Sequence, residues 1–142
     1  MYTKILLPID LNDTTTGRKA LATAAALAKT FGAELHVLSV VPSFGMSIVG
    51  GFFPEGFEEK ALEKARAELG TFMDGELDPA IDATGHVAHG SIYEEILHAA
   101  RKLGCDLIVV GAHRPELKDY LLGPNAARVV RHAPQSVMVI RD

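Results

Sequence analysis

The sequence predicts an α/β fold with one open, twisted sheet of five parallel strands and helices on both of its faces. Short runs rich in Ile, Val and Leu alternate with longer segments in which apolar residues recur at the helical spacing of three or four. Three of the short runs are nearly continuous in hydrophobicity, which is typical of strands that are covered on both sides. The regular alternation of strand and helix favours right-handed crossovers and hence a parallel sheet.

The strands are expected at residues 2–9, 34–41, 81–89, 106–110 and 136–141. The runs at 2–9, 34–41 and 106–110 are the nearly continuous ones, so they belong in the middle of the sheet. Residues 81–89 alternate more in polarity, which indicates a strand nearer an edge.

The four helices expected between these strands cover about residues 14–31, about 57–73, 91–104 and 123–132. Asn12 or Asp13 is suited to cap the first helix, and Gly32 follows its end. The third helix opens with the capping-box pattern Ser91-Ile92-Tyr93-Glu94 and stops at Gly104. Residues 1–142 are thus expected to form a single domain.

Composition excludes several classes of function. A hydrophobic share of 48% with 23% charged residues argues against disorder, and a net charge of −4 argues against a nucleic-acid or anionic-membrane partner. The apolar start at 1–7 is too short for a signal peptide, and no apolar run is long enough to insert in a membrane. The lone Cys105 can form no internal disulfide, so a reducing, cytoplasmic location is expected.

The candidate binding residues follow the strands, because open α/β sheets bind ligands at the carboxyl ends of their strands. Asp10 and Val41 follow the first two strands, and Gly111 follows the fourth. Gly123 and Asn125 open the last helix, whose free N–H groups favour an anion. We expect both glycines to take positive φ and admit a ligand to the backbone. The set predicts a mononucleotide, with its base between the first two strands and its phosphates at the last helix.

Asp10 is suited to accept hydrogen bonds from a ribose hydroxyl or a base amino group, and main-chain groups near Val41 to read a base edge. Arg114, Lys118 and Arg128 are expected to add positive charge near the phosphates. Neither a Walker A sequence nor G-x-G-x-x-G is present. Simple structural roles stay open: Asp10 as a turn or cap residue, and Gly123-Pro124 as an ordinary helix start.

Other chemistry is not expected. His86 and His89 are three apart on a strand and should point to opposite faces, so no metal site is predicted. Cys105 precedes a buried strand and is expected to pack rather than react. The apolar, Gly-rich stretch at residues 42–55 is either a lid on the nucleotide or a contact with a partner subunit.

Several segments resemble the universal stress proteins of the UspA type. They are the opening KILLPID, the strand HVLSVV, the stretch GSIYEEILHAARKLGCDLIVVGAHR and the closing GPNAARVVRHAPQSVMVIR. Nucleotide-binding members carry glycine, two residues, glycine, nine residues, then glycine with Ser or Thr. Here Gly111 is followed by Arg114 at the second position, eight residues, and Gly123-Pro124, which resembles a subgroup with a His-Arg-Pro loop.

The resemblance implies a Rossmann-like sheet of the adenine nucleotide alpha hydrolase-like kind. It implies adenine and ribose contacts at Pro8, Asp10 and Val41, and phosphate contacts at Gly111, Arg114, Gly123 and Asn125. His113, in the same loop, is a candidate donor to the ligand, with a solvent-exposed loop histidine as the alternative.

The resemblance also implies a stress-response sensor or regulator that binds ATP, and a homodimer formed through the last strand at residues 137–140. Whether Mg²⁺ accompanies the phosphates stays open. Two alternatives remain: a member without nucleotide that acts through its dimer or partner surface, and, with less support, a slow ATPase. No catalytic residue is identified, so a binding module is expected rather than an enzyme.

Overall fold

The computed structural model describes residues 1–14, 17–42, 56–112 and 124–141. In these residues five strands form one sheet in the order β3-β2-β1-β4-β5, and every neighbouring pair is parallel. The elements in chain order are β1 (Lys4–Ile9), α1 (Arg18–Phe31), β2 (Glu34–Pro42), α2 (Phe57–Glu76), β3 (Ala83–Gly90), α3 (Ile92–Leu103), β4 (Leu107–Ala112), α4 (Pro124–His132) and β5 (Ser136–Arg141). The α/β class and the open parallel sheet are confirmed, with β3 at an edge as expected.

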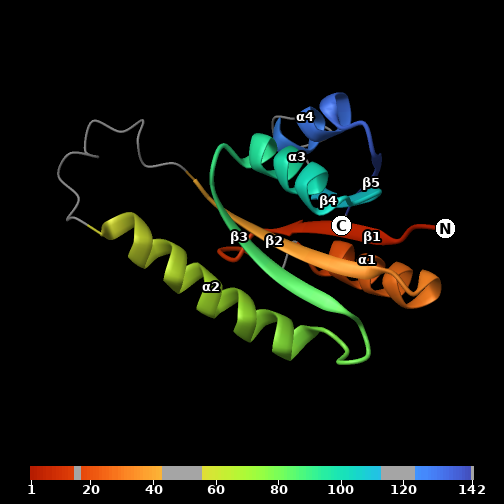
Figure 1. Ribbon diagram of the computed structural model, residues 1–142, viewed down its shortest axis with the longest axis horizontal. Coiled ribbons are helices and arrows are strands. Elements are labelled where there is room, and N and C mark those ends of the chain that lie inside the picture. The colour runs from red at the N-terminus through yellow and green to blue at the C-terminus, as the bar shows by residue number, and fades with distance from the viewer. Residues whose placement is uncertain (15–16, 43–55, 113–123, 142) are drawn as a thin grey trace.

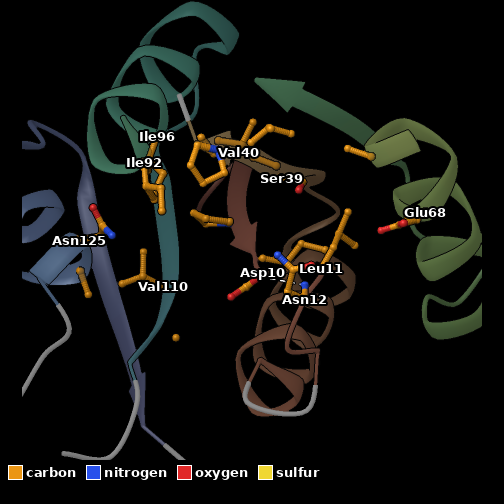
Figure 2. A pocket seen from close by; sticks show the side chains of 18 of the residues that line it. Asp10, Leu11, Asn12, Ser39, Val40, Glu68, Ile92, Ile96, Val110 and Asn125 are labelled. Carbon is orange, nitrogen blue, oxygen red and sulfur yellow. Dashed lines mark hydrogen bonds between the residues drawn. The ribbon is translucent and has the colours of Figure 1, made fainter. Parts of the chain in front are cut away.

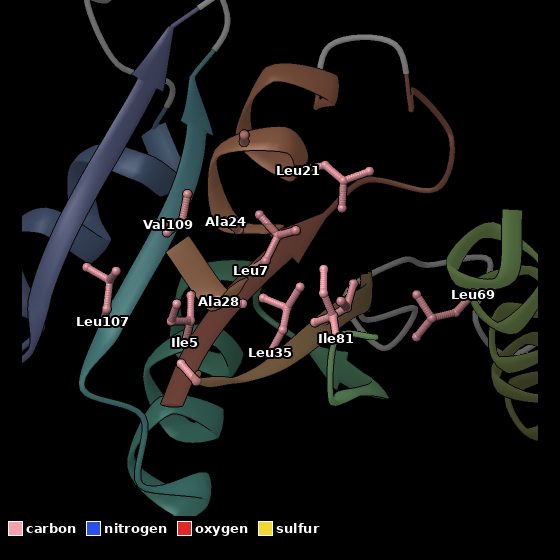
Figure 3. Packing of buried hydrophobic residues seen from close by; sticks show 13 residues of the cluster. Ile5, Leu7, Leu21, Ala24, Ala28, Leu35, Leu69, Ile81, Leu107 and Val109 are labelled. Carbon is pink, nitrogen blue, oxygen red and sulfur yellow. The ribbon is translucent and has the colours of Figure 1, made fainter. Parts of the chain in front are cut away.

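The helices lie in two layers, α1 and α2 on one face of the sheet and α3 and α4 on the other (Figure 1). One buried cluster joins Ala24 of α1 and Leu69 of α2 to Leu35 of β2 (Figure 3). A second cluster joins Ile96 of α3 and Val129 of α4 to strand residues that point the other way. Because successive strand residues alternate between faces, strands between two helix layers must be apolar at nearly every position. This packing explains the continuous apolar runs.

The sheet changes its winding direction at β1. The chain leaves β1 through α1 to reach β2 on one side, and it enters β4 through α3 on the other side. The two connections therefore pack on opposite faces, and a crevice is expected between the carboxyl ends of β1 and β4.

The first helix begins later than the sequence predicts. It starts at Arg18 with Gly17 as its N-cap, so neither Asn12 nor Asp13 caps it. Asp10 instead holds a tight turn, in which its Oδ1 atom accepts the N–H of Asn12 at 2.9 Å and its carbonyl oxygen accepts the N–H of Asp13 at 3.1 Å. The polar residues after β1 turn the chain rather than start the helix.

The ends of the helices follow the glycines. Gly32 and Gly104 end α1 and α3 in the left-handed region, with φ of 64° and 72°, as predicted. Ser91 is the N-cap of α3, but its side chain makes no capping hydrogen bond, so the predicted capping box is wrong in that detail. Of the helices in the described ranges, none has the length and apolar character needed to cross a bilayer.

A hydrogen-bonded chain of Glu34, His36 and His86 ties β2 to the edge strand β3. His36 Nδ1 lies 2.9 Å from His86 Nε2, with the rings stacked, and His36 Nε2 lies 3.1 Å from Glu34 Oε1. When the His36 ring is neutral it has one N–H, so it then donates to Glu34 and accepts from His86. Burial, followed by repulsion from the protonated form of His36, lowers the pKa of His86.

We expect the free energy of unfolding to decrease as the pH falls below 6.5, the ordinary pKa of histidine. The unfolded chain takes up a proton at His86 that the folded chain binds only at lower pH, so acid favours unfolding. Urea unfolding between about pH 5 and about pH 8 measures this slope. The variant His86→Gln should have a flatter profile, and the exposed His98, changed to Gln, controls for loss of a histidine. Equal slopes for wild type and His86→Gln would contradict the assignment.

Candidate functional site

A cavity of about 500 Å³ opens at the carboxyl ends of the central strands (Figure 2). Its lining comes from β1 and the loop after it, β2, α2, α3, β4 and α4: Pro8, Ile9, Asp10, Leu11, Asn12, Leu38, Ser39, Val40, Val41, Pro42, Ala61, Lys64, Ala65, Glu68, Ile92, Ile96, Val110, Gly111, Ala112, Pro124, Asn125 and Ala126. This is the switch point of the sheet, where open α/β folds bind their ligands, and the volume is in the range of small-molecule sites.

Most of the binding candidates named from the sequence line this one cavity. Those present are Pro8, Asp10, Val41, Gly111 and Asn125. They are far apart in the chain and meet because parallel strands end at the same edge of the sheet. His113, Arg114, Lys118 and Gly123 lie outside the described residues, as do residues 43–55.

Asp10 reaches the cavity from a turn that it organises itself. Its bond to the N–H of Asn12 holds the carboxylate just beyond the end of β1. Figure 2 shows the carboxylate directed into the space between its loop and Val110. A carboxylate has about four acceptor positions, so the turn leaves capacity for a ligand on the same side chain. The structural role of Asp10 is confirmed, and it is compatible with a binding role.

The end of β2 offers unpaired backbone to the cavity. Pairing between β1 and β2 stops at Ile9 and Ser39, whereas pairing of β2 with β3 continues through Val41 to Pro42. Beyond Ser39, the edge of β2 that faces β1 has no ladder partner among the described residues. Main-chain groups near Val41 are therefore in a position to meet the edge of a planar ligand.

The other end of the cavity is formed by β4 and the start of α4. Asn125 extends its side chain from α4 toward the cavity (Figure 2), while Pro124 at the first helical position supplies no N–H. Gly111 is not in the left-handed region, so that expectation is wrong: it lies inside β4 and pairs with Ile140. A Cβ added at Gly111 would be in ordinary contact, 3.5 Å from Ala20 Cβ.

The charged groups that line the described cavity are Asp10, Lys64 and Glu68. Arg128, expected near the phosphates, is not in this lining. Its guanidinium lies 5.1 Å from the centre of the Tyr93 ring, a cation–π contact that joins α4 to α3. This contact gives the exposed Arg128 side chain a packing role against the neighbouring helix, and a contribution of its charge to phosphate binding stays a prediction.

The comparisons with known proteins agree with this architecture. The sequence model of the universal stress protein family matches residues 1–141. The chain belongs to the universal stress protein family. Universal stress protein G of Shigella flexneri is 33% identical over 144 residues, which cover 99% of this chain and 100% of that protein.

Solved structures support the same family fold. A universal stress protein of Methanocaldococcus jannaschii is 27% identical over 99% of this chain and 96% of its own length. Its structure superposes with a TM-score of 0.82 at 26% identity, covering 100% of this chain and 97% of that one. A universal stress protein of Archaeoglobus fulgidus, solved in complex with dAMP, has a TM-score of 0.67 at 18% identity, with 98% of both chains covered. At that identity the likeness concerns the fold.

In this universal stress protein α2 forms one wall of the cavity, which the sequence did not predict. Ala61, Lys64, Ala65 and Glu68 are spaced three and four apart and line the cavity together. The sequence places Ala61 and Ala65 on an apolar stripe, which is right for the buried Ala65. Two alanines on a long charged helix indicate either a close contact with another element or an open space beside the helix. The pattern does not distinguish these two cases unless the position of α2 is known.

Ser39 was also missed. It is 5% exposed in a strand that is otherwise apolar, and it lines the cavity. A lone hydroxyl in a buried strand is unfavourable unless it finds a polar partner, so the sequence HVLSVV did carry a usable signal at this position.

The histidines that the structure describes and the cysteine lie away from the cavity lining. His86 contacts His36, and His89 Nδ1 lies 2.7 Å from Glu58 Oε1 of α2, so the two point to opposite faces as predicted. In the described ranges, no three His, Cys, Asp or Glu side chains are grouped to hold a metal ion. Burial, with a smaller effect of Asp106, raises the pKa of the Cys105 thiol to about 11.

We expect iodoacetamide to modify Cys105 slowly in the folded protein. The thiolate is the nucleophile, and a pKa of about 11 instead of 9.0 lowers its fraction roughly 100-fold, before burial restricts access. Mass spectrometry of timed samples compares the folded protein with the urea-unfolded chain at the same pH. Equal rates in the two states would mean that Cys105 is neither buried nor shifted in solution.

Proposed function

We propose that this universal stress protein binds an adenine nucleotide, ATP, and works as a dimeric, cytoplasmic stress-response sensor or regulator, with residues 1–142 as one domain. The observation that carries the proposal is the cavity at the switch point, where Pro8, Asp10, Val41 and Asn125 meet. These residues were selected from the sequence for different parts of one mononucleotide. Their arrangement around a common space is what such a ligand requires.

The proposed ligand lies across the carboxyl end of the sheet. The base packs beside Pro8 and meets the free backbone edge near Val41, and the ribose donates to Asp10. The phosphates lie at the start of α4, with Asn125 and the loop residues Gly111, His113, Arg114 and Gly123. Positive charge for the phosphates comes from Arg114, whose guanidinium suits phosphate oxygens, in the His-Arg-Pro version of the loop.

The relatives support nucleotide as the class of ligand. The Archaeoglobus fulgidus protein of the same fold was solved in complex with dAMP. ATP in place of another adenine nucleotide is the finer part of the proposal, and Mg²⁺ would enter with the phosphates.

A second candidate is a member of the family that binds no nucleotide and acts through its dimer or partner surface. Pro124 favours it, because the first helical position at the phosphate end of the cavity carries a ring where an N–H donor would otherwise be available. The loop before it is also one residue shorter than the nucleotide-binding pattern. A slow ATPase has less support, since the described lining offers no group assigned to a γ-phosphate.

We expect the purified protein to release adenine nucleotide on denaturation, or to bind added ATP in a calorimetric titration. Asp10→Asn should weaken ATP binding about tenfold through loss of a charged acceptor, yet keep its turn, because an amide oxygen also accepts from the N–H of Asn12. Asp10→Ala loses both the charged acceptor and the hydrogen bond from the N–H of Asn12, so it should bind ATP weakly and also have a lower free energy of unfolding.

Three results separate the candidates. If neither ATP nor GTP binds and nothing is released, the member without nucleotide is the better description. If Asp10→Asn binds ATP as tightly as wild type and the wild type shows no ATP turnover that the variant loses, Asp10 is a turn residue only. If Asp10→Asn binds normally but loses a steady ATP turnover that the wild type shows, the enzyme gains support.

The proposed dimer forms through the free edge of β5. Residues 137–140 are half-buried and apolar, and an apolar edge strand invites pairing. We expect light scattering at micromolar concentration to give twice the chain mass of 15.2 kDa. Ile140→Lys on β5 should shift the protein toward monomer, whereas the matched control Val130→Lys, at an exposed apolar residue of α4, should not. A monomeric wild type would refute this surface.

A further inference from the structure

The cavity has two ends of different chemistry. At one end are Asn125 and the apolar side chains of Val110 and Ile92; at the other are the polar groups of Ser39, Lys64 and Glu68. Figure 2 shows Asn125 and Glu68 on opposite sides of the space, with the Asp10 loop between them. The proposed phosphate contacts account for the first end only. The polar groups at the second end have no role so far.

Lys64 and Glu68 form only a weak ion pair with each other. Their ion pair is long, with Lys64 Nζ 3.8 Å from Glu68 Oε1, and their side chains are 79% and 46% exposed. A pair with this length and exposure contributes little to stability. Each group can therefore turn to a ligand at small cost. Figure 2 shows the Glu68 carboxylate directed from α2 toward the loop of Leu11, on the cavity side of the helix.

The neighbouring residues leave room for a flat ligand beside this pair. Ala61 and Ala65 lie on the same face of α2 and also line the cavity, so the helix presents methyl groups between its charged side chains. Ser39, 5% exposed, faces the same space from β2. A hydroxyl both donates and accepts, so Ser39 suits any base and cannot discriminate between bases.

Charge decides which part of a nucleotide this end accepts. At this end the Glu68 carboxylate offsets the Lys64 ammonium group, and Asp10 between the two ends adds a further negative charge, so the end has no excess positive charge to hold a polyphosphate. An uncharged heterocycle is accepted if its donors and acceptors match. Ionised Glu68 only accepts hydrogen bonds and Lys64 only donates them. On the N7 side of its ring, a 6-aminopurine presents an amino donor beside a ring-nitrogen acceptor, whereas a 6-oxopurine presents an oxygen acceptor beside that nitrogen and no donor for a carboxylate.

We infer that two side chains of α2, those of Lys64 and Glu68, select the base. Glu68 accepts one hydrogen of the exocyclic amino group of a 6-aminopurine, and Lys64 donates to N7 beside it, so α2 contacts the side of the base that the main chain near Val41 does not use. A 6-oxopurine in the same place sets its oxygen against the carboxylate and is rejected. This inference rests on the proposed nucleotide site and adds the residues that select its base.

The test compares ATP with ITP, which carries an oxo group in place of the 6-amino group. Calorimetric titration of the wild type should show a preference for ATP of about tenfold or more, as expected when a polar group of the site loses its partner. In Glu68→Gln the preference should fall to roughly threefold or less, because an amide can also donate to the oxo group. Glu63→Gln, a matched change at an exposed residue of α2 outside the cavity lining, should keep the wild-type ratio.

Lys64 is tested in the same way. Lys64→Met should weaken ATP binding about tenfold through loss of a charged donor, whereas Lys60→Met, one turn earlier and outside the lining, should not. Far-UV circular dichroism checks that each variant is folded.

An unchanged ATP to ITP ratio in Glu68→Gln, equal binding of the two nucleotides by the wild type, or an unchanged ATP affinity in Lys64→Met overturns the inference while the nucleotide site stands. If the wild type binds neither nucleotide, the proposed function itself fails. The two failures are therefore distinguishable.

Discussion

The burial of β1 on both faces is the constraint on which the rest of the molecule depends. Ile5, Leu6 and Leu7 are fully buried, and neighbouring residues of a strand point to opposite sides. Both faces of β1 therefore need a helix layer, which α1 and α2 supply on one side and α3 and α4 on the other. Connections on opposite faces change the winding direction at β1, and the cavity lies at that change. The site is thus a consequence of how the core is covered.

Polar residues at the cavity are positioned by two different means. Asp10 lies beyond the helix layers and is held by its own hydrogen bond to the N–H of Asn12, so a local turn sets the direction of its carboxylate. Ser39 is instead positioned by the buried strand to which it belongs. Its hydroxyl is tolerated there because this part of the strand borders the cavity. Lys64 and Glu68 depend on the placement of a whole helix.

The two edges of the sheet differ in the polarity of their side chains. At the β3 edge, Glu34, His36 and His86 form a polar tie to β2, and His89 pairs with Glu58 of α2. The β5 edge carries half-buried apolar side chains instead. Polar and charged groups discourage edge-to-edge pairing, and apolar ones permit it. The β3 edge is therefore expected to remain unpaired, while the β5 edge can pair with a second subunit, as the proposed dimer requires.

The sequence by itself determined the order of strands and helices, the buried central strands, the helix ends at Gly32 and Gly104, and the choice of Asp10 and Val41 as cavity residues. These properties follow from hydrophobic period and backbone preference, which are written in short stretches of chain. Only the tertiary structure decided that Gly111 continues a strand, that Arg128 packs on Tyr93, and that α2 brings Lys64 and Glu68 to the cavity. Each of these depends on which element lies beside another. A contact between residues distant in the chain leaves no pattern in the local sequence of either one.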